Sequence, residues 1–200
     1  MRDEAFRELE REWRATRDAE LEQAYVQSVV RRGLPRARLL LAGYLGSSAA
    51  LGLLGDQGFA EEPSLGSWLA GLGAGRLARK RELARESALR GALAALALLR
   101  AEGEGSPQLD AASEVVSRWI QDPSEANRAE VRSLRQDPEP IPALARAVLA
   151  RRVNESARSA AKVADYVVSA LRTRYRKNQQ VVRSAIYAEL LPWALSVDPS

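Results

Sequence analysis

The 200-residue sequence predicts an all-α protein, and two features of its composition support this prediction. Alanine and leucine, which favour helices, occur 35 and 28 times, whereas phenylalanine occurs twice and methionine once. Adjacent β-branched residues, which favour strands, are limited to pairs such as Val115-Val116. We expect one domain over residues 1–200, an irregular multi-helix bundle of about nine or ten helices with helical-hairpin, partly solenoid-like organisation. A subdivision into a helical-hairpin region, 1–137, and basic C-terminal helices, 140–200, is compatible with this fold.

The first 33 residues predict two helices. Phe6, Leu9 and Trp13 recur at helical spacing among charged residues, which is typical of a surface helix with one narrow buried stripe. Asp18 precedes a second helical pattern and can cap it, and Gly33 follows its last turn.

Short helices are predicted for the next segment, because ten of the 13 glycines lie between residues 33 and 75. Pro35 suits the first turn of a third helix, and a corner at Gly46-Ser47 separates this helix from another that ends at Gly55. The uncharged run 39–55 approaches the length of a membrane span, but its central Gly and Ser residues favour two short buried helices. Ser64 is expected to open a further short helix.

A longer helix over 76–101 is predicted to be the core of the protein. Its second half, 88–99, is apolar nearly all round apart from Arg90, which favours an enclosed, central position. The next helix follows at 109–119. The sequence Asp122-Pro123-Ser124-Glu125 then predicts another helix start, with Asp122 as its cap.

The C-terminal third predicts longer helices. A helix that starts near Pro142 would carry a seam of apolar residues at intervals of three and four, namely Val153, Ala157, Ala160, Ala164, Val167 and Leu171. A contact inside one chain and a homodimer interface both fit such a seam. A last helix is predicted over 181–195 and contains Pro192.

Histidine and cysteine are both missing, which excludes imidazole acid–base catalysis, thiolate nucleophiles and the commonest transition-metal ligands. Glu82 and Glu86 lie one helical turn apart, but the arginines around them favour solvated ion pairs over a metal site. None of the three lysines stands in a Ser-x-x-Lys arrangement. We therefore expect no catalytic residue, no metal and no cofactor.

The glycine-rich segment Gly71–Arg76, followed by Arg79 and Lys80, offers two interpretations. Glycines and cations before a helix can receive an anion, and they can equally form a simple turn between helices. The segment lacks the preceding strand that a dinucleotide-binding fingerprint requires.

Positive charge is concentrated at the C-terminal end of the chain. The formal net charge is +4, and the last 61 residues carry ten Lys and Arg but only four Asp and Glu. A solvated face, a protein-docking surface and a phosphate-binding surface all fit this pattern. The candidate interaction surface consists of Arg172, Arg174, Tyr175, Arg176, Lys177 and Arg183.

These observations favour a non-catalytic module that binds a partner protein. The alternative is a nucleic-acid-associated protein that uses its arginine-rich C-terminal helices. The N-terminus leads into a charged helix with no apolar signal region, so a cytoplasmic location without membrane association is expected.

Five segments follow one another in the order AFRELEREWRATRD, RARLLLAGYLGSSAALGLLG, ALRGALAALALL, SRWIQDPSEANRAEVRSL and ARSAAKVADYVVSAL. In this order they resemble a group of poorly characterised helical proteins from high-GC bacteria, some of them labelled immunity proteins. The resemblance implies a compact α-helical domain that sequesters a toxin made beside it, so an immunity or adaptor role is the specific prediction. Members of this group often carry a histidine where this chain has Ser47, so any role of that histidine does not extend to this chain.

Overall fold

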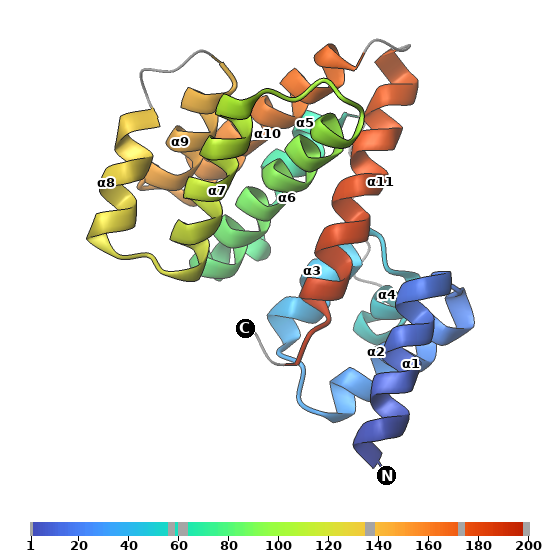
Figure 1. Ribbon diagram of the computed structural model, residues 1–200. Helices are drawn as coiled ribbons and strands as arrows, with labels where there is room; N and C mark the ends of the chain where they lie inside the picture. Colours follow the sequence, from blue (N-terminus) through green and yellow to red (C-terminus); the bar gives the residue numbers. More distant parts are fainter. Residues whose placement is uncertain (1, 56–58, 60–63, 135–138, 172–174, 198–200) are drawn as a thin grey trace. The chain divides into compact units, whose positions relative to one another are not determined.

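Helices make up almost all of the regular structure that the computed structural model shows (Figure 1). It describes residues 2–55, 59, 64–134, 139–171 and 175–197, apart from four side chains, those of Arg2, Asp3, Tyr175 and Arg176. These residues form eleven α-helices and one short 3-10 helix, and none of them lies in a strand. The predicted all-α bundle is confirmed. The chain divides into two compact units, Met1–Glu61 with Leu190–Ser200 and Glu62–Glu189.

The first unit is organised around aromatic residues of its first two helices. Trp13 and Tyr25 are almost completely buried, and their rings stack with centroids 4.7 Å apart. Phe6 also stacks on Tyr25, with centroids 5.6 Å apart. Of the predicted buried stripe, Trp13 is buried, whereas Phe6 and Leu9 are half-buried. Asp18 caps the second helix as predicted, because its side chain accepts hydrogen bonds from two backbone N–H groups. The helices of this part are α1 (Arg2–Thr16), α2 (Ala19–Arg31), α3 (Arg36–Leu45) and α4 (Ser48–Leu54).

The corner between α3 and α4 forms where the sequence predicts it. Gly46 ends α3 in the left-handed region, with φ +117°, and Ser47 accepts a hydrogen bond from the N–H of Ala50. The uncharged run 39–55 is thus divided between two short helices. None of the helices in the described residues combines the length and the apolar character that a membrane span requires.

The second unit is built around the pairing of two long helices. α10 packs against α5, α6 and α9, and all six residues of the predicted seam are at most 8% exposed within one copy of the chain. Alanines at Ala157, Ala160 and Ala164 allow the neighbouring helices to approach closely. The elements are α5 (Leu65–Gly71), η1 (Leu77–Arg79), α6 (Arg81–Ala101), α7 (Pro107–Gln121), α8 (Glu125–Ser133), α9 (Ile141–Leu149), α10 (Val153–Ala170) and α11 (Tyr175–Ala194).

Four predicted boundaries are wrong. The last helix, expected over 181–195, begins at Tyr175 as α11. The long central helix begins at Arg81 rather than at residue 76, because Gly75 adopts φ +57° and Lys80 has a non-helical backbone conformation. The helix expected from Pro142 through residue 171 is broken at Ala150, which has φ −58° and ψ 132°. The cap of α8 is Ser124, whose side chain accepts from the N–H of Asn127, whereas Asp122 ends α7.

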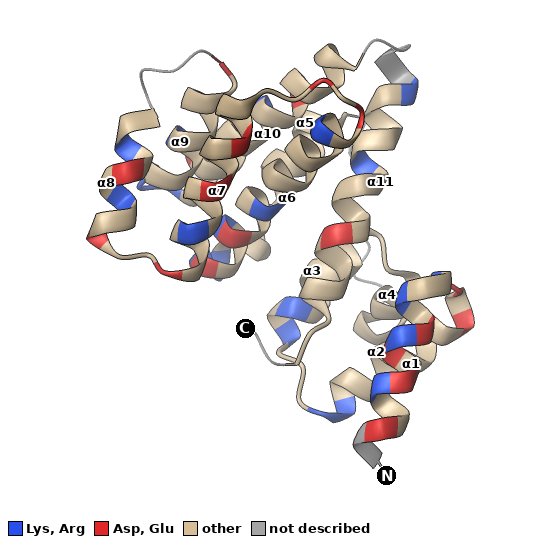
Figure 2. Ribbon diagram, in the orientation of Figure 1, with Lys and Arg blue, Asp and Glu red and all other residues tan. Residues whose placement is uncertain are grey.

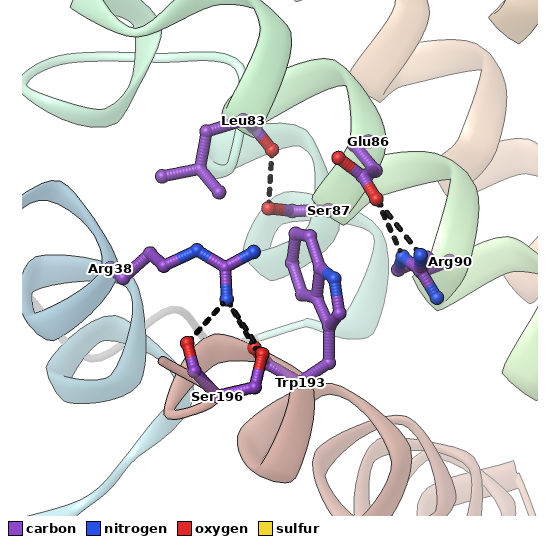
Figure 3. Close-up of polar contacts among 7 residues, drawn as sticks. All are labelled: Arg38, Leu83, Glu86, Ser87, Arg90, Trp193 and Ser196. Atoms are coloured by element: carbon purple, nitrogen blue, oxygen red, sulfur yellow. Dashed lines mark hydrogen bonds and ion pairs between the residues drawn. The ribbon is translucent and has the colours of Figure 1, made fainter. Parts of the chain in front are cut away.

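The end of α11 belongs to the first unit, where Arg38 of α3 holds it (Figure 3). Arg38 is only 8% exposed, and its Nη1 donates hydrogen bonds to the carbonyl oxygens of Trp193 and Ser196 at 2.7 and 3.0 Å. Carbonyl groups at the end of a helix have no partner inside the helix, so a buried guanidinium can satisfy them. Residues from both ends of the sequence therefore complete one packed unit.

Candidate binding surfaces

A groove runs along α6 on the side that faces α7 and the nearby part of α11. Its volume is about 580 Å³. We call it the α6–α7 groove. Its floor is apolar and consists of the exposed Ala97 and Ala101 and the half-buried Leu93 and Leu98. The rim is formed by Arg90, Arg100, Ser113, Glu114, Ser117 and Glu189.

The rim of the α6–α7 groove carries charges of both signs. Arg90 is bound to Glu86 of the same helix through Nε and Nη2, each at 2.9 Å (Figure 3). Arg100 pairs with Asp110 of α7 at 2.6 Å, which fixes one end of the groove. At 1.5 Å per residue, the stretch of α6 from Arg90 to Ala101 is about 16 Å long, or three helical turns.

The groove corrects one prediction about the core. Residues 88–99 were expected to be enclosed on all sides, and Leu89, Ala92 and Leu99 are indeed at most 1% exposed. Ala97, however, is exposed on the groove side of the same helix. An apolar stretch of helix is normally covered all round, so this uncovered side is an apolar surface without a partner inside the described chain.

A smaller hollow of about 310 Å³ lies between α6 and α7 at residues Glu82, Arg85, Glu86, Trp119, Ile120 and Pro123. The Nη2 of Arg85 donates a hydrogen bond to the carbonyl oxygen of Ala150 at 2.9 Å, so this nitrogen is already engaged. Glu86 is engaged by Arg90, as described above. Among the described residues no group of three acidic side chains could hold a metal ion.

Two described groups have a displaced pKa, and they belong to different units. Burial raises the pKa of the Tyr25 phenol well above its usual value, and the Glu10 carboxylate beside it raises this pKa further. Partial desolvation also raises the pKa of the Asp165 carboxyl group, although the residue as a whole is exposed; its Oδ2 lies 3.0 Å from the position of a Cβ built on Gly66. Neither group lines the α6–α7 groove.

The predicted interaction surface can be placed only in part. Arg172 and Arg174 lie outside the described residues, as do the side chains of Tyr175 and Arg176. Lys177 is exposed in the first turn of α11. Arg183 is half-buried, with its guanidinium 4.7 Å from the ring centroid of Trp68. Arg183 therefore packs against an aromatic core residue, where part of its surface is no longer available to a ligand.

Structure brings together two basic segments that are far apart in the sequence. Gly73 packs so tightly on the start of α10 that a Cβ at Gly73 would lie 2.8 Å from the carbonyl oxygen of Val153. Arg85, one turn beyond Arg81, binds the carbonyl oxygen of Ala150. The start of α6 and the junction between α9 and α10 are therefore neighbours. We call the exposed cations at this place the basic surface, namely Arg79, Lys80, Arg81, Arg151, Arg152 and Arg158.

Sequence reasoning found only half of this basic surface. The sequence indicated an anion site as one interpretation of the segment Gly71–Arg76 with Arg79 and Lys80. Its proximity to residues 151–158 in the fold cannot be predicted from one sequence. The contact of Gly73 with α10 supports the second interpretation, a turn between helices. The cations that follow this turn are nevertheless exposed.

Comparison of the chain with family models, with curated proteins and with solved structures found no match. The arguments about function therefore rest on the residues and their geometry.

Proposed function

We propose that this chain is a protein-interaction module that binds an amphipathic helix of a partner protein in the α6–α7 groove. The observation that carries the proposal is the apolar groove side of α6, where Ala97 is exposed and Leu93 and Leu98 are half-buried. Small floor residues allow a helix backbone to approach closely, and a groove of this shape is a common site for helical peptides.

The groove also indicates the chemistry of the partner. Its length corresponds to about three turns, so the bound helix would present small or apolar residues at i, i+3, i+4 and i+7. Because the rim carries arginines on α6 and the carboxylates of Glu114 and Glu189, the flanks of that helix would carry charges of both signs. An immunity protein that inhibits a toxin by binding it is one member of this class.

Affinity capture from the source cells tests the proposal when three forms of the protein are compared. Ala97→Glu places a charged, longer side chain on the groove floor at an exposed helical position. Ala129→Glu makes the same change at an exposed position of α8 that does not line the groove. A partner retained by the wild-type protein and by Ala129→Glu, but lost by Ala97→Glu, is the expected result. Equal retention by all three forms would contradict the proposal.

A further inference from the structure

We infer that the basic surface is a second binding site, which takes the phosphate backbone of a duplex nucleic acid without reading its sequence. This site lies on different elements from the α6–α7 groove and does not depend on the proposed protein partner. Its cations come from two segments, 79–81 and 151–158, which the contacts of Gly73 and Arg85 bring together.

Among the described residues of this unit, missing ion pairs distinguish these six cations from four arginines, although the exposed Arg128, Lys162 and Lys177 also have no ion pair. Arginines elsewhere in that unit pair with carboxylates at 2.5 to 2.6 Å, namely Arg100 with Asp110, Arg118 with Glu130, Arg132 with Glu125 and Arg146 with Glu139. Within the described part of the chain, none of the six cations of the basic surface has such a partner. The carboxylates of Glu82 and Glu155 lie nearest in the sequence, and both are exposed.

The ends of two helices add to the positive potential of the basic surface. α6 and α10 both begin there, and their cap residues are the cations Lys80 and Arg152. Neither helix has a side-chain hydrogen bond to its first N–H groups, in contrast to α2, α4, α5, α7 and α8. α3 and α9 also have no such bond, but their cap residues are the uncharged Pro35 and Pro140. Cations at a helix N-terminus are unfavourable because they face the positive end of the helix dipole. A bound anion would relieve this repulsion and accept from the free N–H groups.

The net positive charge of the chain lies on the unit that carries this surface. Residues 62–189 contain 21 Lys and Arg against 15 Asp and Glu, whereas the other unit contains nine Arg against eleven Asp and Glu. On α7 and α8 the two signs are interspersed in Figure 2, so the positive excess of the unit lies elsewhere.

The residues favour a duplex over a protein or a single strand. Protein interfaces depend on buried aromatic or apolar anchors, and the large apolar side chains exposed among the described residues are Leu53, Tyr166 and Val181, none of which lies in segments 79–81 or 151–158. Single-strand binding relies on aromatic side chains that stack on bases, and these two segments contain no aromatic residue. A duplex backbone requires only positive charge and N–H groups.

Fluorescence anisotropy with the full chain and a labelled 20-base-pair DNA of arbitrary sequence tests this inference. We expect binding at 50 mM salt and a loss of affinity of roughly 1,000-fold at 200 mM salt, because about six phosphate contacts release counterions. A chain that does not bind at 50 mM salt, or that binds equally well at both salt concentrations, overturns the inference.

Two charge-matched triple variants separate the basic surface from the net charge. Arg151→Gln/Arg152→Gln/Arg158→Gln should weaken binding at 50 mM salt by at least tenfold and reduce the slope of log affinity against log salt by about 2.7. Arg118→Gln/Arg128→Gln/Arg132→Gln removes the same charge from α7 and α8, and its affinity should remain within about threefold of the wild type. Equal losses in both variants would show a net-charge effect and overturn the assignment. Circular dichroism and urea unfolding establish that each variant is folded.

The two-segment origin of the basic surface has its own test. Arg79→Gln/Lys80→Gln/Arg81→Gln should weaken duplex binding as much as Arg151→Gln/Arg152→Gln/Arg158→Gln does. Full affinity in this variant would contradict a single surface formed by both segments. If a single strand binds more tightly than a duplex of equal length, the ligand is a single strand and the inference is overturned. If poly-glutamate displaces the duplex at equal charge, the ligand is an acidic protein and the inference is overturned as well.

Discussion

The buried Arg38 contacts both the backbone and the ring of the half-buried Trp193. The Nη1 of Arg38 donates to the carbonyl oxygen of Trp193 at 2.7 Å, and its guanidinium carbon lies 4.9 Å from the Trp193 ring centroid (Figure 3). The hydroxyl of Ser196 accepts from the same nitrogen at 2.9 Å. This arrangement joins the end of α11 to α3 within the first unit.

Replacing Arg38 should therefore destabilise the protein strongly. Arg38→Met keeps most of the apolar stem but leaves the carbonyl groups of Trp193 and Ser196 without this donor, at an expected cost of about 2 to 4 kcal/mol in the free energy of unfolding. Urea denaturation measures this cost. The control is Arg36→Met on the exposed start of α3, for which we expect a change within about 0.5 kcal/mol. Equal effects of the two changes would contradict the account of Arg38.

The contact between Ser47 and Glu22 predicts a second stability effect. Ser47 is fully buried, donates from its hydroxyl to Glu22 Oε1 at 2.6 Å, and caps α4 by accepting from the N–H of Ala50. Ser47→Ala removes both hydrogen bonds, so the free energy of unfolding should fall by about 1 to 3 kcal/mol. Ser48→Ala, one residue later and exposed, is the control. In a double-mutant cycle with Glu22→Ala, which removes the acceptor, a coupling energy of zero would refute the direct interaction.

Alanine substitutions at Gly73 and at Gly52 should change the free energy of unfolding in opposite directions. A Cβ at Gly73 would lie 2.7 Å from Cβ of Ala157 and 2.8 Å from the carbonyl oxygen of Val153. Gly73→Ala should destabilise the protein by about 1 to 3 kcal/mol, because α10 or the turn must move. Gly52→Ala, within α4 and with no atom within 4 Å, should stabilise it by up to about 1 kcal/mol. Thermal unfolding of the two variants decides, and a shift of the same sign in both would contradict the contact.

Asp165 predicts a pH-dependent effect. Because partial desolvation raises its pKa in the folded state, the unfolded state loses this proton more readily as the pH rises, and ionisation of Asp165 reduces stability at neutral pH. The residue is exposed, so solvent screening keeps this effect small. Asp165→Asn should therefore raise the melting temperature slightly at pH 7, and the difference from the wild type should shrink towards pH 3, where the carboxyl group is protonated in both states. Glu155→Gln on the exposed start of α10 is the matched neutralisation. An identical gain for Asp165→Asn at both pH values would rule out the titration of this group.

Local sequence signals predicted much of the fold. Asp18 and the Gly46-Ser47 corner were identified correctly because capping and left-handed turns depend on residues that are adjacent in the sequence. The break at Ala150 was missed because alanine and arginine favour a continued helix. What ends α9 there includes contacts from other elements, such as the bond from Arg85 to the Ala150 carbonyl and that from Ser156 to the Ala147 carbonyl. Tertiary contacts of this kind override local propensity.

The candidate sites were less predictable than the fold. Both the α6–α7 groove and the basic surface combine residues from distant parts of the chain, and one sequence contains no signal for such proximity. Pattern analysis of residues 88–99 showed apolar residues on all sides of the helix. It could not show that one of these sides, at Ala97, is uncovered.

Site-directed photo-crosslinking in the source cells tests the central claim, that the α6–α7 groove binds a partner protein. A benzophenone amino acid at Glu114 stands at the rim of the groove, and the same amino acid at Ala129 stands on exposed α8 away from it. We predict one dominant adduct from position 114 that is missing from position 129 and disappears when Ala97→Glu is added. The same adducts from both positions, or an adduct from position 114 that persists with Ala97→Glu, would contradict the claim.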